Sequence, residues 1–350
     1  MFDHLNFYYN NSSSVVYLNR KFEEDTGRLE AKPGNYNAFR MDSFNKVFYP
    51  MQLFNFLNVN PYVASRETFY SEDSEGDDNV VRDIFQTGVD VYTRFYKIYD
   101  VETDYLDLDI HRLRHLIIPQ ARYTFLPTPS VRRDQLHQFD DIDDIQMENT
   151  VELTLEHKLQ TKRTREPDGV ETVDLLTFIT ETDFILRDEL DNDFELSDTI
   201  EYDLEINPYD WMSIYFDSLF HRRKKRIDVF NADLHIRGSD EDAIRMGYRY
   251  EKHENSQATA YWKHHINREN WRKHWAFEIY ERFEFQEKRF QEQQYTLIKD
   301  LHCWTGEVTC RIKNENDFTF WVIFRLKAFP DLPFYFRTTY HGPDPGRSRR

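Results

Sequence analysis

Between Thr199 and Ile206 an apolar residue occupies every even position and a polar or acidic residue every odd one. Successive side chains of a β-strand point to opposite faces, so this period of two predicts a strand with one apolar and one polar face. The same alternation returns in segment after segment of the chain. A compact soluble core has no room for so many apolar faces, whereas a transmembrane β-barrel sets one face against lipid and the other against a water-filled lumen. The pattern therefore predicts an all-β, antiparallel transmembrane β-barrel.

We expect about fifteen strands, joined by tight turns into a meander in which each strand bonds to its neighbours in sequence. A β-sandwich shows the same alternation but rarely exceeds about ten strands, so the count favours a barrel. About fifteen strands form only a partial barrel, and we expect a curved open sheet or an irregular closure with its edge near residues 36–48 unpaired. The expected strands lie near residues 36–48, 53–70, 83–99, 110–126, 147–162, 173–186, 196–206, 210–220, 227–237, 242–251, 256–266, 272–285, 291–299, 303–312 and 318–328.

The chain divides into three expected regions. Residues 1–35 are weakly patterned, with room for one strand; residues 36–329 form the barrel region; residues 330–350 form a C-terminal tail. The first residues lack the basic and apolar segments of a signal peptide. Since a barrel protein must be exported, we expect the chain to be the downstream part of a longer protein or a truncated gene product.

Composition agrees with this fold class. Aromatic residues make up 16% of the chain, which suits the aromatic belts of a membrane barrel. No apolar run approaches the ~18 residues that a membrane-spanning helix requires. The net charge of −18 argues against nucleic acid as a partner.

The alternation assigns faces to individual side chains. We expect the apolar residues Ile200, Leu204, Phe277, Phe320 and Phe324 to face lipid. The residues expected to face the lumen are acidic: Glu152, Glu156, Glu201, Asp203, Glu205 and Asp233.

Trp211, Trp271 and Trp304 each follow a short turn at the start of an expected strand. Membrane barrels carry aromatic girdles at both interfaces and their short turns on the periplasmic side. The three tryptophans therefore predict a periplasmic-side girdle, although ordinary strand packing explains any single one of them.

The sequence contains no recognisable catalytic constellation. Histidines and carboxylates fall on alternating strand positions without the nucleophile–base arrangement of covalent catalysis, and no glycine-rich phosphate loop is visible. His264 and His265 are expected on opposite faces of one strand, which makes them a poor metal site. We expect no enzymatic activity, no cofactor and no metal.

Three stretches resemble one known family. Residues 113–127 contain His115, Pro119, Tyr123 and Pro127 at a spacing of four, with Phe139-Asp140 in the following loop. The other two are the paired short strands over residues 193–250 and the turn at residues 300–304. Together they resemble the C-terminal, barrel-forming half of LptD, the LPS-assembly or organic solvent tolerance protein family, over roughly residues 45–328.

This resemblance implies a location in the cell outer membrane, with the lipid bilayer around the barrel. It implies passage of lipopolysaccharide and its insertion into the outer leaflet. It also implies two protein partners, a plug lipoprotein of the LptE type and the periplasmic bridge that delivers lipopolysaccharide. An acidic lumen disfavours tight binding of this anionic cargo, which suits a conduit, or it simply keeps the interior hydrated.

Two features depart from the family. Family barrels lie at the ~26-strand end of the known range, well above the number expected here. The family begins one strand with two adjacent cysteines, whereas His302 and Cys303 stand at those positions. The family's thiols form disulfides with its periplasmic domain, so the resemblance makes Cys303 the candidate disulfide cysteine.

Counting along the expected strand puts Cys303 on the lumen face and Cys310 on the lipid face. On one strand the two thiols stand too far apart to bridge. Both cysteines as small buried apolar residues remain the alternative. For the whole chain, a generic outer-membrane porin or receptor barrel and a soluble all-β binding protein remain alternative functions.

Overall fold

The computed structural model describes residues 7–20, 36–165, 169–186, 195–238, 242–266, 274–313 and 317–341. Over these residues the chain forms twenty β-strands and two short 3₁₀ helices. Strands that are neighbours in sequence pair antiparallel along most of the chain. The predicted all-β antiparallel meander is confirmed, with more strands than the expected number of about fifteen. No helix in these segments is long and apolar enough to cross a membrane.

The strands are β1 (Tyr8–Arg20), β2 (Tyr36–Phe48), β3 (Met51–Leu53), β4 (Leu57–Glu72), β5 (Asp78–Tyr92), β6 (Phe95–Thr103), β7 (Ile110–Leu126), β8 (Glu148–Arg165), β9 (Gly169–Ile185), β10 (Glu195–Leu196), β11 (Thr199–Tyr209), β12 (Met212–His221), β13 (Arg226–Arg237), β14 (Ala243–Glu251), β15 (Asn255–Ile266), β16 (Trp275–Glu284), β17 (Arg289–Asp300), β18 (Trp304–Lys313), β19 (Asp317–Leu326) and β20 (Phe329–His341). The 3₁₀ helices are η1 (Tyr105–Asp107) and η2 (Arg133–Gln135).

The chain divides into two compact units, and strands β7, β8 and β9 contribute residues to each. Unit 1 comprises residues 1–95, 117–156 and 181–198. Unit 2 comprises residues 96–116, 157–180 and 199–350.

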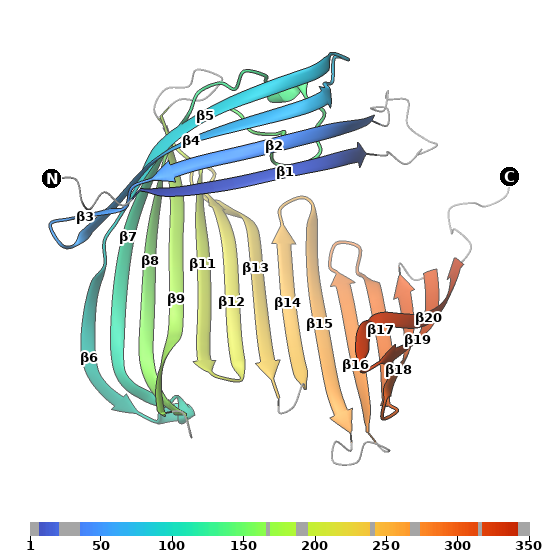
Figure 1. Ribbon diagram of the computed structural model, residues 1–350. Helices are drawn as coiled ribbons and strands as arrows, with labels where there is room; N and C mark the ends of the chain where they lie inside the picture. Colours follow the sequence, from blue (N-terminus) through green and yellow to red (C-terminus); the bar gives the residue numbers. More distant parts are fainter. Residues whose placement is uncertain are drawn as a thin grey trace. The chain divides into compact units, whose positions relative to one another are not determined.

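In unit 1, β1, β2, β4 and β5 lie side by side (Figure 1). The second half of β7 pairs with β5 over residues 120–125. β2 pairs along its length with β1 and over residues 40–48 with β4, so the expectation of an unpaired edge at residues 36–48 is wrong. β1 is rich in Ser and Asn and carries almost no alternation of its own; its pairing with β2 makes it a strand.

Two predicted strands of unit 1 are interrupted. The segment 53–70 contains a hairpin between β3 and β4, where Phe54 and Asn55 adopt positive φ angles of 53° and 62°. The segment 83–99 breaks between β5 and β6 at Thr93. The hydroxyl of Thr93 donates to the carbonyl oxygen of Phe56 at 2.8 Å, and its amide donates to the carbonyl oxygen of Pro119 at 3.2 Å. Such breaks depend on partners distant in sequence, which periodicity does not detect.

In unit 2, the strands from β11 to β20 follow one another as antiparallel neighbours (Figure 1). Register shifts interrupt a few pairs, for example between Leu219 and Phe220. The strand β20 occupies residues 329–341, so the prediction of a tail from residue 330 is wrong for that part of the chain. Its pairing with β19 fixes it, because Pro and Arg residues break its own apolar alternation.

Charged, polar and apolar side chains share the buried face of unit 1, while several apolar side chains of the opposite face are exposed. The side chains of Arg82 and Thr68 are 0% exposed, whereas those of Val81 and Val63 are 53% and 50% exposed. Arg82 and Val81 are neighbours in the chain, so the two faces of β5 differ sharply. Lys, Arg, Glu and Asp are almost never fully buried in soluble proteins unless they are paired. The buried face of unit 1 therefore encloses Arg82 and Thr68 beside Tyr70 and Ile84.

Unit 2 likewise has an uncovered apolar face. Strand register aligns Trp262, Ile279, Tyr295, Cys310 and Phe320 in one row across five strands. The side chains of Trp262, Tyr295 and Phe320 in this row are exposed. Contiguous exposed apolar surface of this kind marks a membrane or protein contact. We call this side of unit 2 the apolar face and the opposite side the polar face.

Candidate functional site

The polar face of unit 2 carries four of the predicted lumen residues. Register places Asp203 opposite Asp217, Asp217 opposite Asn231, and Asn231 opposite Arg249. The next row contains Glu205, Tyr215 and Asp233. The alternation therefore named one coherent side of the sheet, because cross-strand partners share a face. Glu201 lies on the same side of β11 and is exposed.

Basic side chains accompany the acidic ones on this face. Arg249 donates from Nη2 to both carboxylate oxygens of Asp233, at 2.8 and 2.9 Å. Lys263 lies 3.4 Å from Glu278. Glu292 lies between Arg282 and Arg311 and forms an ion pair with each. The polar face thus contains several cross-strand ion pairs beside the facing carboxylates of Asp203 and Asp217.

The sequence analysis named acidic members of this face and overlooked the basic ones. Alternation identifies them in principle, because Arg249, Lys263, Arg282 and Arg311 all occupy polar-face positions of their strands. Their pairing with particular carboxylates follows from strand register, which is set by the hairpins. Charges paired in this way make the face less anionic than the predicted list implies.

The other two predicted lumen residues, Glu152 and Glu156, lie on the part of β8 that belongs to unit 1. Arg122 of β7 donates from Nη1 to Glu152 Oε1 at 3.1 Å and from Nε to Asp90 Oδ1 at 2.8 Å. Glu156 is half-buried. As in unit 2, an arginine on a neighbouring strand pairs with a predicted acidic residue.

A loop is fastened to the buried face of unit 1 by five side chains, which we call the clasp: Arg40, Tyr70, Arg82, Asp140 and Asp143. Arg40 donates to both oxygens of Asp140, at 2.7 and 2.6 Å, and to Asp143 Oδ1 at 2.8 Å. The hydroxyl of Tyr70 donates to the same oxygen of Asp143 at 2.8 Å. Asp143 Oδ2 accepts the backbone amides of Phe139 and Asp140 at 2.9 and 3.2 Å.

Arg82 completes the clasp by binding backbone carbonyl oxygens of the loop between β7 and β8. Its guanidinium donates to the carbonyl oxygens of Val131 at 2.9 Å and Ile142 at 3.0 Å, and also to that of Ile145. The hydrogen bonds from Arg40 hold the pKa of the Asp140 carboxyl below its usual range. Because every member has a partner, the clasp holds residues 127–147 against β2, β4 and β5.

The clasp was not predicted. Arg40 and Arg82 have apolar same-face neighbours such as Ala38 and Ile84, and Phe139-Asp140 was singled out only for a family resemblance. Nothing local in the sequence joins residue 40 to residue 143. The clasp is a positioning device, and its residues show no nucleophile with an adjacent general base.

Two of the three predicted girdle tryptophans lie in the described parts of the chain, and Trp271 lies outside them. Trp211 occupies the turn between β11 and β12 and stacks on Tyr209, with ring centroids 4.8 Å apart. Trp304 is the first residue of β18. The turns before β12 and β18 lie at the same end of the meander, since each leads from an odd-numbered to an even-numbered strand (Figure 1). That this end faces the periplasm stays a prediction.

Cys303 does not begin a strand, contrary to expectation. It lies in the turn before β18, where it is exposed, and its Sγ is 3.0 Å from His302 Nδ1. His302 has a positive φ of 71°, and Cys303 follows it one residue before β18 begins; its lumen-facing orientation stays a prediction. Cys310 lies between Tyr295 and Phe320 on the apolar face. Both cysteines are free thiols.

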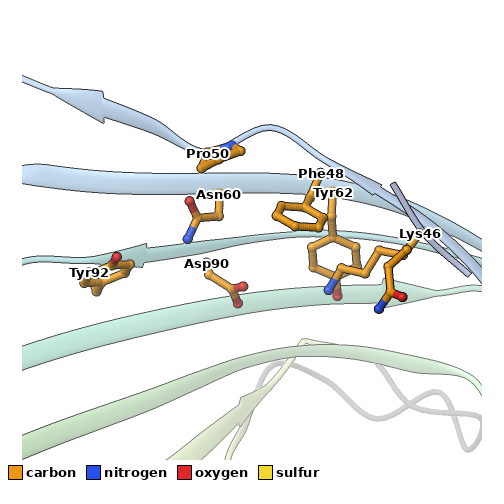
Figure 2. Close-up of a pocket in the computed structure, with 8 residues that line it drawn as sticks. Lys46, Phe48, Pro50, Asn60, Tyr62, Asp90 and Tyr92 are labelled. Carbon is orange, nitrogen blue, oxygen red and sulfur yellow. The ribbon is translucent and has the colours of Figure 1, made fainter. Parts of the chain in front are cut away.

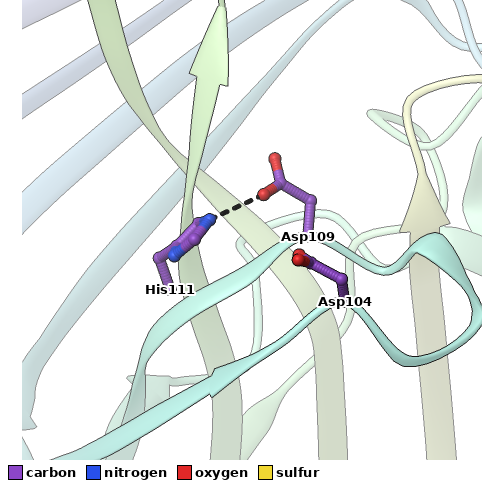
Figure 3. Close-up of side chains that lie close together, drawn as sticks. All are labelled: Asp104, Asp109 and His111. Atoms are coloured by element: carbon purple, nitrogen blue, oxygen red, sulfur yellow. Dashed lines mark ion pairs between the residues drawn. The ribbon is translucent and has the colours of Figure 1, made fainter.

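One group of side chains has the composition of a metal site (Figure 3). Asp104, Asp109 and His111 offer ligand atoms that all lie within 4.8 Å of one another, around η1. His111 Nε2 is 2.8 Å from Asp109 Oδ1, and both side chains are substantially exposed. One imidazole and two carboxylates suit a divalent cation. This group was not predicted, because the positive φ at Asp109 curls the chain and brings the three together.

His264 and His265 lie on opposite faces of β15, the first beside Trp262 and Phe277 and the second beside His274, yet both reach one carboxylate. The Nδ1 atoms of the two rings lie 3.0 and 2.8 Å from the two oxygens of one carboxylate, that of Asp242 at the start of β14. Asp242 lies just outside the ladder of β14 with β15, where it reaches both rings. The arrangement is an acid–imidazole cluster.

Comparison with known proteins gives no family for this chain. No protein-family description matches the sequence, and no curated protein matches it.

Proposed function

We propose that this chain is the membrane β-sheet of an LPS-assembly protein of the LptD type, which passes lipopolysaccharide to the outer leaflet of the outer membrane. One observation carries the membrane part of this proposal: on β5 the side chain of Arg82 is enclosed, whereas that of the neighbouring Val81 is exposed. A membrane reverses the usual rule because lipid is the apolar solvent outside and polar groups must be satisfied inside.

The apolar face of unit 2 supports the same conclusion independently. Its exposed residues include Trp262 on β15, Leu297 on β17, Val308 on β18, and Phe320 and Phe324 on β19. These strands are consecutive in the sheet once β16 is included. Exposing such a surface to water costs roughly 25 cal/mol per Å² of apolar area. Lipid removes that cost without any protein partner.

The paired charges of the polar face favour passage over tight binding. A phosphate group that reaches Arg249 must compete with the Asp233 carboxylate, which already accepts two hydrogen bonds. Conduction requires binding sites that are favourable enough to enter and weak enough to leave. The resemblance over roughly residues 45–328 supplies the identity of the cargo, and no other observation favours a different one.

The membrane part is tested by spin labels at two positions of β17. Leu297 lies on the apolar face and Gln294 on the polar face. In a protein with Cys303 and Cys310 replaced by Ser, Leu297→Cys and Gln294→Cys are each labelled in lipid vesicles. We expect oxygen to relax the label at position 297 more strongly and a water-soluble nickel complex to relax the one at 294. Equal access of the nickel complex to both labels would contradict the membrane assignment.

The cargo is tested by photo-crosslinking in a bacterium that makes lipopolysaccharide. A photoreactive amino acid replaces Asp203 on the polar face or Leu204 on the apolar face, and an antibody to lipopolysaccharide detects the crosslinked band. The proposal expects a band at position 203. A band at position 204 alone would make lipopolysaccharide merely a neighbouring lipid, and no band at either position would favour a porin or receptor.

A further inference from the structure

A pocket of about 370 Å³ opens on the side of unit 1 that also carries Arg82, near the last residues of β2 and β5 and the first residues of β4 (Figure 2). Its volume is at the small end of the range of ~300–1,000 Å³ for small-molecule sites. The residues that line it come from both β1 and its neighbours: Asn10, Lys46, Phe48, Pro50, Asn60, Tyr62, Asp90 and Tyr92.

The ring of Tyr62 has a fixed position in this pocket. Its hydroxyl accepts a hydrogen bond from Gln86 Nε2 at 3.1 Å, and Lys46 Nζ lies 3.8 Å from the ring centroid. Gly88 provides the space for the ring, since a Cβ at that position would come within 2.7 Å of it. Phe48 adds a second aromatic surface, stacked on Tyr8 with centroids 5.3 Å apart. The pocket therefore has preformed aromatic walls.

Hydrogen-bonding groups stand beside these rings. Within the described segments, the side-chain amides of Asn10 and Asn60 have no hydrogen-bond partner, and both line the pocket. Asn60 lies directly opposite Asp90 in the strand register. Arg122 binds one oxygen of the Asp90 carboxylate and so fixes its orientation. The pocket thus offers two amides, which both donate and accept, and one oriented acceptor.

We infer that this pocket binds one or two neutral sugar rings of a saccharide chain. A pyranose ring presents a C–H face that packs on an aromatic ring and an edge of hydroxyls that both donate and accept. Phe48 and Tyr92 meet the first requirement, and Asn10, Asn60 and Asp90 meet the second. A phosphate fits less well, because the single ammonium group, that of Lys46, already faces the Tyr62 ring while Asp90 adds negative charge.

Two sources supply such a sugar, namely the saccharide part of lipopolysaccharide and a free oligosaccharide. The first source rests on the proposed function, whereas the pocket's preference for a sugar rests on its own side chains. In either case the amides without partners gain hydrogen bonds on binding.

The test is calorimetric titration of the purified full chain in detergent with three probes. They are the core oligosaccharide released from lipopolysaccharide by mild acid, maltotriose as a free neutral glucan, and lipid A. The variant Asn10→Ala/Asn60→Ala removes both amides. Asn45→Ala is the matched control, because it removes an amide of β2 that bonds to Tyr9 and Asn11 instead of lining the pocket.

We expect the core oligosaccharide to bind, with affinity reduced at least tenfold in the double variant and unchanged in the control. If maltotriose binds and the core oligosaccharide does not, the pocket is a sugar site whose ligand does not come from lipopolysaccharide. The inference is overturned if neither sugar binds, if the control loses as much affinity as the double variant, or if lipid A alone binds. Failure of the crosslink at position 203 with sugar binding intact would contradict the conduit and leave this site standing.

Discussion

Replacing Asp143 by Ala tests whether the clasp holds the loop of residues 127–147 in place. The side chain of Asp143 is fully buried and accepts hydrogen bonds from Arg40, Tyr70 and the backbone amides of Phe139 and Asp140. The substitution removes all of these acceptors at once. Arg40 retains Asp140 as its one carboxylate partner.

The expected cost follows from the groups left behind. Breaking a buried ion pair by removing one partner costs about 3–5 kcal/mol, because the remaining charge stays buried without its counter-charge. Asp140 still neutralises Arg40, which favours the lower end of that range. The Tyr70 hydroxyl loses its acceptor, at roughly 1–3 kcal/mol for an unsatisfied buried group. We therefore expect a loss of about 3–5 kcal/mol in the stability of unit 1.

Hydrogen–deuterium exchange of the loop and urea unfolding in detergent measure this loss. Exchange of residues 127–147 should accelerate strongly in Asp143→Ala and stay unchanged in Asp141→Ala, an exposed carboxylate in the same loop. A surface substitution such as Asp141→Ala changes the free energy of unfolding by no more than about 0.5 kcal/mol. If the two variants exchange and unfold alike, the clasp does not hold the loop.

Four further outcomes are expected. Phe320→Arg should destabilise insertion into lipid vesicles by about 2–4 kcal/mol if the residue lies near the bilayer midplane, measured as the folded fraction against urea and compared with Phe320→Leu. The pKa of Asp140 is lowered in the docked loop, so the stability that this carboxylate gives to docking is complete above the ordinary carboxyl pKa of ~3.9 and is lost as the pH falls through the lowered pKa. Hydrogen exchange of the loop should therefore rise at that low pH in the native chain, and Asp140→Asn should abolish this pH dependence. Gly88→Ala should destabilise unit 1 by about 1–3 kcal/mol, since its Cβ would meet the backbone carbonyl oxygen of Tyr123 as well as the Tyr62 ring, and an unchanged midpoint of urea unfolding would contradict this close packing. Cys303, exposed in its turn, should react with a water-soluble maleimide faster than the other thiol, as mass spectrometry of the labelled peptides would show; the reverse order would contradict the turn geometry.

The local pattern of the sequence was sufficient for many of the strands and for their faces. The predicted strands at residues 36–48 and 110–126 coincide with β2 and β7. Alternation also grouped Asp203 and Glu205 with Asp233 on one side of the sheet. This works because the backbone of a strand points successive side chains to opposite faces, so a strand between an apolar and a polar environment has alternating apolar and polar residues.

Some elements had no local signal. β1 is a strand through its pairing with β2, and the hairpin before β4 interrupts an otherwise plausible run. The expected strand at residues 303–312 begins one residue later, at Trp304, after the positive φ of His302. In each case a pairing partner or a single backbone dihedral decided the outcome, and neither is visible as periodicity.

The candidate sites depended still more on tertiary structure. The sequence named the acidic residues of the polar face, and strand register then paired Asp233 with Arg249. The clasp joins Arg40 and Asp143 across 103 residues of chain. The sugar pocket combines Asn10, Asn60 and Asp90 from three strands. A period of two says which way a side chain points, whereas its neighbours are set by register and by how a loop folds back, and these arise only when distant parts of the chain meet.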